Sequence, residues 1–261
     1  MEKQKVPILV YHHVYPDDTP NVERAEEGQT VTGIISVSTL RKQLQFIKDE
    51  GWTVISTTQL SDWLKKKTSI PEMSVVLQFD NGWLDTLNTA VPLLAEFGYT
   101  SICYAITQGV QAATEGKETS TRTRSEGVII KPFLTWDGVR ELVEAGCEIG
   151  AHTHTHCQIQ VKLEEQGADA IIEEVEISNQ LFEQGAGLAP AHFAYPSGSR
   201  SQSSDDILAP KYTTLRRWRD NPQPINWVFT DADTPLTAIE CQNIDNCVRF
   251  EDFTRIFQEA S

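Results

Sequence analysis

The sequence predicts one α/β domain over residues 1–261, with parallel strands in a closed (β/α) barrel or in an open doubly wound sheet. Two observations predict this class. Short apolar runs alternate with segments of helical periodicity from end to end, as in successive β-α-β units. No internal repeat and no convincing domain boundary divides the chain, and a chain of this length can bury a large core.

The first half of the chain is expected to provide four strands and three helices. In the first helix Leu40, Leu44 and Ile47 lie on one face, and Gly51 supplies the stop. Pro92 lacks a backbone donor, so the third helix should kink or restart there. The strands are predicted at residues 6–10, 52–56, 74–79 and 100–106, and the helices from near residue 38, at 59–67 and at 83–97.

The second half is expected to hold a long polar loop, two helices and further strands. Residues 111–127 are too polar for a core and long for a connection, so they predict a mobile loop. Thr135 can cap a helix that carries Val139 and Leu142 on one face and ends at Gly146. Strands are predicted at residues 147–151 and 191–195, a long helix at 163–183, and weaker late strands at 212–218 and 227–230.

The composition excludes some partners. A net charge of −15 argues against binding nucleic acid or an anionic membrane, because both require a positive surface. The sequence shows no run of about 18 apolar residues and no signal peptide, so no membrane insertion is expected. Five cysteines without C-x-x-C spacing predict free thiols and a cytoplasmic protein, or an extracellular one if a leader has been removed. No feature predicts an oligomeric state.

Polar side chains gather at four predicted strand ends, where barrels and open α/β sheets carry their functional groups. The four sets are Tyr11-His12-His13, Asp80-Asn81-Gly82, His152-Thr153-His154-Thr155-His156 and Tyr195-Pro196-Ser197-Gly198. They contain five of the six histidines in the chain. Histidines that merely fill a core would be scattered, so this concentration indicates a functional site.

The three histidines after the fifth strand predict a metal site. If the chain turns helical there, His152 and His156 stand at i, i+4 and can bind one ion; if it stays extended, His154 joins them on one side. Neutral imidazole is the commonest biological ligand of zinc, whereas a polar loop is the alternative interpretation. A haem or blue-copper site is disfavoured, because suitably spaced Met and Cys are missing.

The other strand ends offer the remaining groups of a metal-assisted hydrolase. Asp80 or Asn81 can give an oxygen ligand, and zinc lowers the pKa of a water that a carboxylate base then deprotonates. Backbone N–H groups near Ser197 can receive an oxyanion, and His12 or His13 can act as a general acid. Taken singly, these motifs would be turns and a polar strand end.

In this order the motifs resemble the polysaccharide deacetylase family, the carbohydrate esterases of family 4 with the NodB homology domain. The resemblance runs from about Val6 to Gly198. F-D-N-G-W at residues 79–83 resembles F-D-D-G-[YW], E-I-G-A-H-T-H-T-H at 148–156 resembles E-I-G-[SA]-H-[ST]-x-x-H, and F-A-Y-P-S-G at 193–198 resembles F-A-Y-P-x-G. Segments 7–14 and 134–137 look most like the branch that acts on poly-N-acetylglucosamine and related surface polysaccharides.

The resemblance implies a distorted (β/α)7 barrel and metal-dependent removal of acetyl from an N-acetylated sugar, which is the expected partner. By motif, Asp80 would be the general base and His152 and His156 metal ligands, while the N–H near Ser197 would contribute to the oxyanion hole. The expected cofactor is a divalent metal, first Zn²⁺, with Co²⁺ or Ni²⁺ as alternatives.

The general acid is implied in the same way. Many members of the family supply it from a histidine near the C-terminus, but no histidine follows His192 here. The polysaccharide branch instead uses a histidine from the N-terminal segment. His12 is therefore the expected acid, with His13 as second choice.

One position departs from the family. Asn81 stands where a second aspartate normally ligates the metal, and its neutral carboxamide gives the site one charge less to hold a cation. Three accounts stay open: a working enzyme with a weaker metal site, an inactive relative that binds sugar, or an isolated substitution. Hydrolysis of a non-carbohydrate amide is a further alternative, since fold does not decide substrate. Exposed aromatic rings at the barrel mouth, with Trp83, Trp136 and Tyr195 as candidates, would favour sugar.

Overall fold

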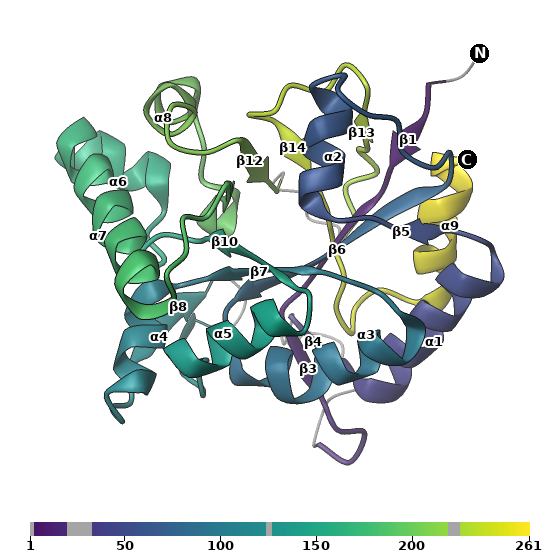
Figure 1. The fold of residues 1–261 in the computed structure, drawn as a ribbon, viewed down its shortest axis with the longest axis horizontal. Coiled ribbons are helices and arrows are strands. Elements are labelled where there is room, and N and C mark those ends of the chain that lie inside the picture. The colour runs from purple at the N-terminus through teal and green to yellow at the C-terminus, as the bar shows by residue number, and fades with distance from the viewer. Residues whose placement is uncertain (1–2, 20–32, 124–126, 219–224) are drawn as a thin grey trace.

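The computed structural model describes residues 3–19, 33–123, 127–218 and 225–261. Within these ranges one large parallel sheet is surrounded by helices (Figure 1). Its strands are β2 (Ile8–Tyr11), β5 (Thr53–Val54), β6 (Ser74–Asn81), β7 (Ile102–Ala105), β10 (Glu148–Ala151), β11 (His192–Ala194), β12 (Thr214–Arg217), β14 (Ile239–Glu240) and β15 (Gln242–Asn243). Their order is β14, β12, β11, β10, β7, β6, β2 and β15, and β5 pairs with β6 beside this path.

The segment 239–243 closes this sheet into a barrel. β14 pairs with β12, with Ile239 opposite Arg216, and β15 pairs with β2, with Gln242 opposite Leu9. Only Cys241 separates β14 from β15, so one stretch of chain joins the two ends of the sheet. If β14 and β15 are counted as one strand position, the barrel has seven strand positions. The expected distorted (β/α)7 barrel is confirmed, and the open sheet is wrong.

Helices cover the outside of the barrel. They are α1 (Val37–Asp49), α2 (Thr57–Leu64), α3 (Val91–Phe97), α4 (Thr107–Thr114), α5 (Trp136–Glu144), α6 (Ile159–Gln166), α7 (Ala168–Ala186), α8 (Gln202–Leu208) and α9 (Phe250–Ala260). Thr135 caps α5 as predicted, because its side chain accepts a hydrogen bond from the N–H of Gly138. Pro92 lies in the first turn of α3, after a π-helical turn over Thr86–Ala90, so the predicted restart is confirmed.

Strand alternation separates an outer apolar layer from a barrel interior. Leu77 and Phe79 of β6 are fully buried in the cluster that α1 and α9 form against the sheet. Because successive side chains of a strand point to opposite faces, Gln78 and Asp80 face the interior. Each fully buried large apolar side chain contributes about 1.5–3 kcal/mol, so this outer layer holds the strands in place. Figure 1 shows β1 (Lys5–Val6) and α9 on the same side, where Lys5 Nζ donates to the carbonyl of Glu259.

Three sequence expectations were wrong. Residues 111–127 are not one loop: α4 runs to Thr114, and β8 (Ser120–Thr123) pairs with β9 (Gly127–Ile130) in an antiparallel hairpin, with residues 124–126 outside the described ranges. Its inward side chains include Thr121 and Thr123, so no apolar alternation marked it. The long helix is two, α6 and α7, because Gly167 at φ 83° breaks it. The last predicted strand is only β13 (Thr230–Asp231), paired with β1 (Lys5–Val6), and α9 was not predicted.

Two short parallel strands, β3 (His13–Tyr15) and β4 (Ile34–Ser36), lie next to the carboxyl end of β2. All five cysteines are free thiols, as their spacing predicted. In the described part of the chain, every helix is too short or too polar to span a membrane.

Candidate active site

Three of the predicted site residues converge at the carboxyl ends of neighbouring strands. Asp80 lies near the end of β6, His12 follows β2, and His152 follows β10. His12 Nε2 lies 4.0 Å and His152 Nε2 lies 3.9 Å from Asp80 Oδ2. The barrel therefore brings together side chains that are up to 140 positions apart in the sequence.

The rings of His152 and His156 lie with their centroids 5.0 Å apart and their planes tilted by 60°. The Nδ1 of His152 lies 2.7 Å from the carbonyl oxygen of Ala194, and the Nδ1 of His156 lies 2.7 Å from that of Arg122. A carbonyl only accepts, so each Nδ1 carries the proton and each Nε2 keeps its lone pair. Burial lowers the pKa of His152 to about 3 and also lowers that of His156. Both rings are therefore neutral near pH 7, which is the form that binds metal.

Asn81 lies level with the residue before His152, because Asn81 and Ala151 are both in register with Ala105. Its side-chain Oδ1 is buried without a hydrogen-bond partner, an arrangement that a bound cation would satisfy. Its backbone has φ 80°, which asparagine tolerates better than most residues. Two imidazole nitrogens and one carboxamide oxygen fit a borderline divalent ion. Among the described residues no three His, Cys, Asp or Glu side chains form a metal group.

The histidine turn, residues 152–156, is neither a helix nor an extended strand. Thr153 and His156 have φ values of 65° and 59°, so the chain turns at both positions. The N–H groups of Thr107 and Gln108, at the start of α4, donate to the carbonyls of Thr153 and His154. His154 Nδ1 lies 3.1 Å from the hydroxyl of Thr107, so this ring is held apart from the other two. Both sequence alternatives, a helix with His152 and His156 at i, i+4 and an extended segment with three histidines on one side, are therefore wrong.

Thr155 of this turn is held by Glu174, a residue that the sequence analysis did not single out. Glu174 Oε1 accepts the N–H of Thr155 at 2.6 Å and its hydroxyl at 2.8 Å. Lys162 Nζ donates to Oε2 at 2.8 Å. Burial would raise the pKa of Glu174, but the bonds from Lys162 and Thr155 outweigh it and hold that pKa below its usual value. A buried carboxylate therefore supports the turn that carries both candidate ligands.

Arg216, also absent from the sequence prediction, binds the carboxylate of Asp80. Its Nη2 donates to both oxygens, at 2.5 and 2.6 Å, and the two side chains are 3% and 6% exposed. The guanidinium lies over the ring of Tyr104, 5.2 Å from its centroid. Tyr104 in turn requires Gly150, because a Cβ there would lie 2.3 Å from the ring. Burial would raise the pKa of Asp80, but Arg216 and His152 hold it below its usual value, so Asp80 is a carboxylate.

His12 and His13 have different surroundings. His13 Nδ1 lies 2.7 Å from Asp85 Oδ2, the N–H of Val14 donates to Oδ1 of the same carboxylate, and the His13 ring stacks on Trp83. Asp85 thus supports the rim at β3. His12 instead faces Asp80, and burial lowers its pKa to about 4 despite the opposing charge of Asp80.

Ser197 lies in a tight turn after β11, the strand between β10 and β12 in the sheet. Its φ is 53°, and the next residue, Gly198, must be glycine, because a Cβ there would lie 2.0 Å from the carbonyl oxygen of Trp218. Asp205 of α8 accepts hydrogen bonds from the hydroxyl of Tyr195 at 2.7 Å and from Arg200 Nε at 2.8 Å. The turn is therefore fixed from both sides.

The aromatic rings considered as sugar platforms are buried. Trp83, Trp136 and Tyr195 are 0%, 4% and 1% exposed. They belong to the core, so they offer no ring face to a ligand at the barrel mouth.

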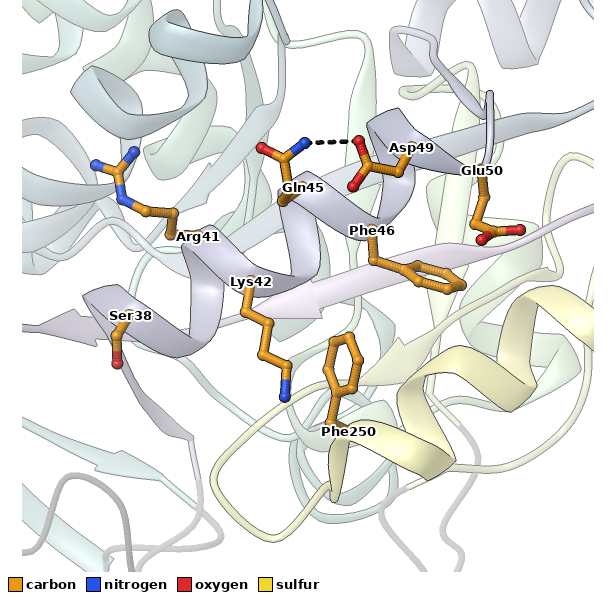
Figure 2. A pocket seen from close by; sticks show the side chains of 8 residues that line it. All are labelled: Ser38, Arg41, Lys42, Gln45, Phe46, Asp49, Glu50 and Phe250. Atoms are coloured by element: carbon orange, nitrogen blue, oxygen red, sulfur yellow. Dashed lines mark hydrogen bonds between the residues drawn. The ribbon is translucent and has the colours of Figure 1, made fainter.

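A pocket lies on the outside of the barrel between α1 and α9 (Figure 2). The rings of Phe46 and Phe250 meet edge to face there, and Lys42 Nζ lies 3.9 Å from the centroid of Phe250. None of its lining residues belongs to the group around Asp80. The pocket is thus separate from the candidate active site.

Comparisons with known proteins point to one family. A family model described as "Polysaccharide deacetylase" matches residues 65–212. The poly-beta-1,6-N-acetyl-D-glucosamine N-deacetylase of Escherichia coli (strain K12) is 26% identical over 142 residues, which is 54% of this chain and 20% of that protein. The chain spans 59% and 20% of the lengths of two curated relatives that it matches.

Solved structures show the same fold. The Streptococcus pyogenes deacetylase PplD in complex with acetate superposes with a TM-score of 0.75 at 21% identity, over 98% of this chain and 99% of that one. IcaB from Ammonifex degensii gives 0.75 at 19% identity, over 99% and 98% of the two chains.

Proposed function

The chain belongs to the polysaccharide deacetylase family, and we propose that it removes N-acetyl groups from an N-acetylated sugar polymer or its precursor with the help of a divalent metal. The observation that carries this proposal is the convergence of His12, Asp80 and His152, with 4.0 and 3.9 Å separating the imidazoles from the carboxylate. The name of the Escherichia coli relative supports poly-N-acetylglucosamine as the first substrate to test.

His152, His156 and Asn81 would hold the metal, through the two Nε2 atoms and the carboxamide oxygen. Zn²⁺, or else Co²⁺ or Ni²⁺, would polarise the acetyl carbonyl there and lower the pKa of the attacking water. The carbonyls of Ala194 and Arg122 fix the tautomers of the two rings before any metal arrives. The neutral oxygen of Asn81 predicts weaker binding than a carboxylate would give.

Asp80 acts as the general base in this proposal. The reaction adds water to the acetyl carbon, breaks the C–N bond and yields acetate and a free amine, so one proton must leave the water and one must reach the nitrogen. Arg216 keeps Asp80 ionised and fixes both of its oxygens, which leaves the carboxylate ready to accept the proton of the water. The buried guanidinium thus acts as a positioning group for the base.

His12 passes the proton to the leaving amine. Its Nε2 lies 4.0 Å from Asp80 Oδ2, so the proton that Asp80 takes from water has a short path to His12. The neutral resting state of His12 agrees with this order of events, since it receives the proton during turnover. The backbone N–H of Ser197 donates to the oxyanion that forms at the former carbonyl oxygen.

The test is release of acetate from N-acetylglucosamine oligomers with added Zn²⁺ or Co²⁺. We expect release that a chelator abolishes and that the His152→Ala variant lacks. Equal acetate release by the parent chain and this variant would refute the proposal. An N-acetylated amino acid tested in parallel separates a sugar deacetylase from an amidohydrolase that acts on other amides.

Asn81 favours a second candidate function, a relative that binds sugar and hydrolyses it slowly or not at all. A site with one charge less holds a cation less firmly, and catalysis falls with metal occupancy. The Asn81→Asp variant decides between the two: a large gain in metal affinity and acetate release would show that the carboxamide had limited the parent chain. Oligomer binding without acetate release in both forms would favour the second function.

A further inference from the structure

The histidine turn is held by groups that belong to two different helices, α4 and α7. The N–H groups of Thr107 and Gln108 of α4 donate to the carbonyls of Thr153 and His154 at 3.4 and 3.0 Å. Glu174 of α7 accepts the N–H and the hydroxyl of Thr155, at 2.6 and 2.8 Å. Of the three residues between His152 and His156, Thr153 and His154 therefore have their carbonyls fixed by α4, and Thr155 has its amide fixed by α7.

Glu174 is well suited to fix this geometry. Its side chain is 3% exposed, and both of its oxygens are engaged, one by Thr155 and the other by Lys162 Nζ at 2.8 Å. A buried carboxylate with partners on both oxygens has little freedom to move. Glu174 hydrogen-bonds Thr155, the residue directly before His156, and the backbone of His156 has φ 59°. Loss of these hydrogen bonds would free the backbone that positions the His156 ring.

We propose that Glu174 is the positioning residue of the metal site, setting the separation of His152 and His156 through Thr155. The inference rests on the proposed function, since it concerns the same two histidines as metal ligands. It assigns to α7 a part in metal affinity, although no side chain of α7 would contact the ion. Partners of metal ligands have measurable effects, and their loss commonly lowers metal affinity by about 10–100-fold.

The test compares four variants of the full chain by calorimetric titration with Zn²⁺ and by the absorption spectrum of bound Co²⁺. Glu174→Ala removes all three hydrogen bonds and should weaken metal binding by about 10–100-fold and alter the Co²⁺ spectrum. Glu174→Gln keeps an oxygen for Thr155 and should retain more of the affinity than Glu174→Ala. Thr155→Val removes one of the two bonds at nearly constant shape and should give an intermediate loss.

The matched control is Glu176→Ala, on the same helix. Glu176 is 54% exposed and pairs with Lys211 at 3.0 Å on the surface, so its loss should leave affinity and spectrum unchanged. If Glu174→Ala fails to fold in thermal unfolding, Glu174→Gln and Thr155→Val carry the comparison.

The outcomes separate the inference from the proposed function. If the parent chain binds metal and the Glu174 and Thr155 variants bind it with the same affinity and the same Co²⁺ spectrum, the inference is overturned. The proposed function would still stand. Absence of metal binding in the parent chain would overturn both. Graded losses in the order Ala, Val, Gln, with Glu176→Ala unchanged, would establish Glu174 as the positioning residue.

Discussion

Replacing Arg216 with methionine should destabilise the protein strongly, because it leaves the carboxylate of Asp80 buried without its partner. Both oxygens of Asp80 bind the guanidinium, and both side chains are almost fully buried. Removal of one partner of such a pair costs about 3–5 kcal/mol. At the size of this chain, that corresponds to a fall in the melting temperature of roughly 6–20 °C.

A thermodynamic cycle isolates the cause of this loss. The double variant Arg216→Met, Asp80→Asn removes both charges, so it should recover most of the stability that Arg216→Met alone loses. Urea unfolding of the parent, the two single variants and the double variant gives the four free energies. Arg41→Met serves as control, since Arg41 pairs with Glu96 at an exposed site where such pairs contribute little to stability.

The pH dependence of Arg216→Met has a defined sign. Arg216 helps to lower the pKa of Asp80 below 3.8, so the stability it gives is present above pH 3.8 and is lost as the pH falls through the lowered pKa. Without Arg216 burial prevails and raises that pKa, so the acid limb of kcat/KM should move to higher pH. A loss below 1 kcal/mol, or a double variant as unstable as Arg216→Met, would refute the reasoning.

Three further predictions concern the site. Asn81→Asp should raise Zn²⁺ affinity at least about tenfold in calorimetric titration, because aspartate tolerates the same positive φ and adds a charge; unchanged affinity would contradict this. His12→Gln should lower kcat by about 10²–10⁴-fold with little change in melting temperature, whereas full activity would exclude His12 as the acid. In the metal-free protein burial lowers the pKa of His152 to about 3, so the folded protein resists protonation of this ring and its stability falls as the pH drops below 6.5. Urea unfolding between pH 7 and pH 5 should therefore show a loss of stability that is about 2 kcal/mol smaller for His152→Gln than for the parent chain. Equal losses in the two proteins would contradict this prediction.

The sequence predicted the site through one rule, that polar groups after apolar strands meet at one rim. Asp80, His12 and His152 obey it, and both imidazoles lie within 4.0 Å of the Asp80 carboxylate. Local sequence signals did not distinguish His12 from His13, because the two residues are adjacent, and His12 was preferred only from the family resemblance. In the structure His12 faces Asp80, whereas His13 contacts Asp85.

The supporting residues were missed because their signals are weak in a single sequence. Arg216 lies in a strand that was predicted, and Leu215 of the same strand is fully buried in the outer layer. Because side chains alternate along a strand, the outward Leu215 implies that Arg216 points into the barrel. The strand pattern is weak in this part of the sequence, however, and an arginine there is easily taken for a surface residue. Glu174 stands three residues after Ile171 and four before Ser178, both fully buried, so it shares the buried face of α7. Its place on that face was the available signal.

The stretch that closes the barrel also bears on how the chain folds. Leu9 of β2 pairs with Gln242 of β15, so the final seam joins residues more than 230 positions apart. Contacts of such long range form late and slowly, because the loop between them must be ordered first. During synthesis the strands from β2 to β12 are complete before β14 and β15 emerge, and two sheet edges stay open until then. A chain stopped before residue 239 would keep both edges unpaired and would be prone to associate with other copies through them.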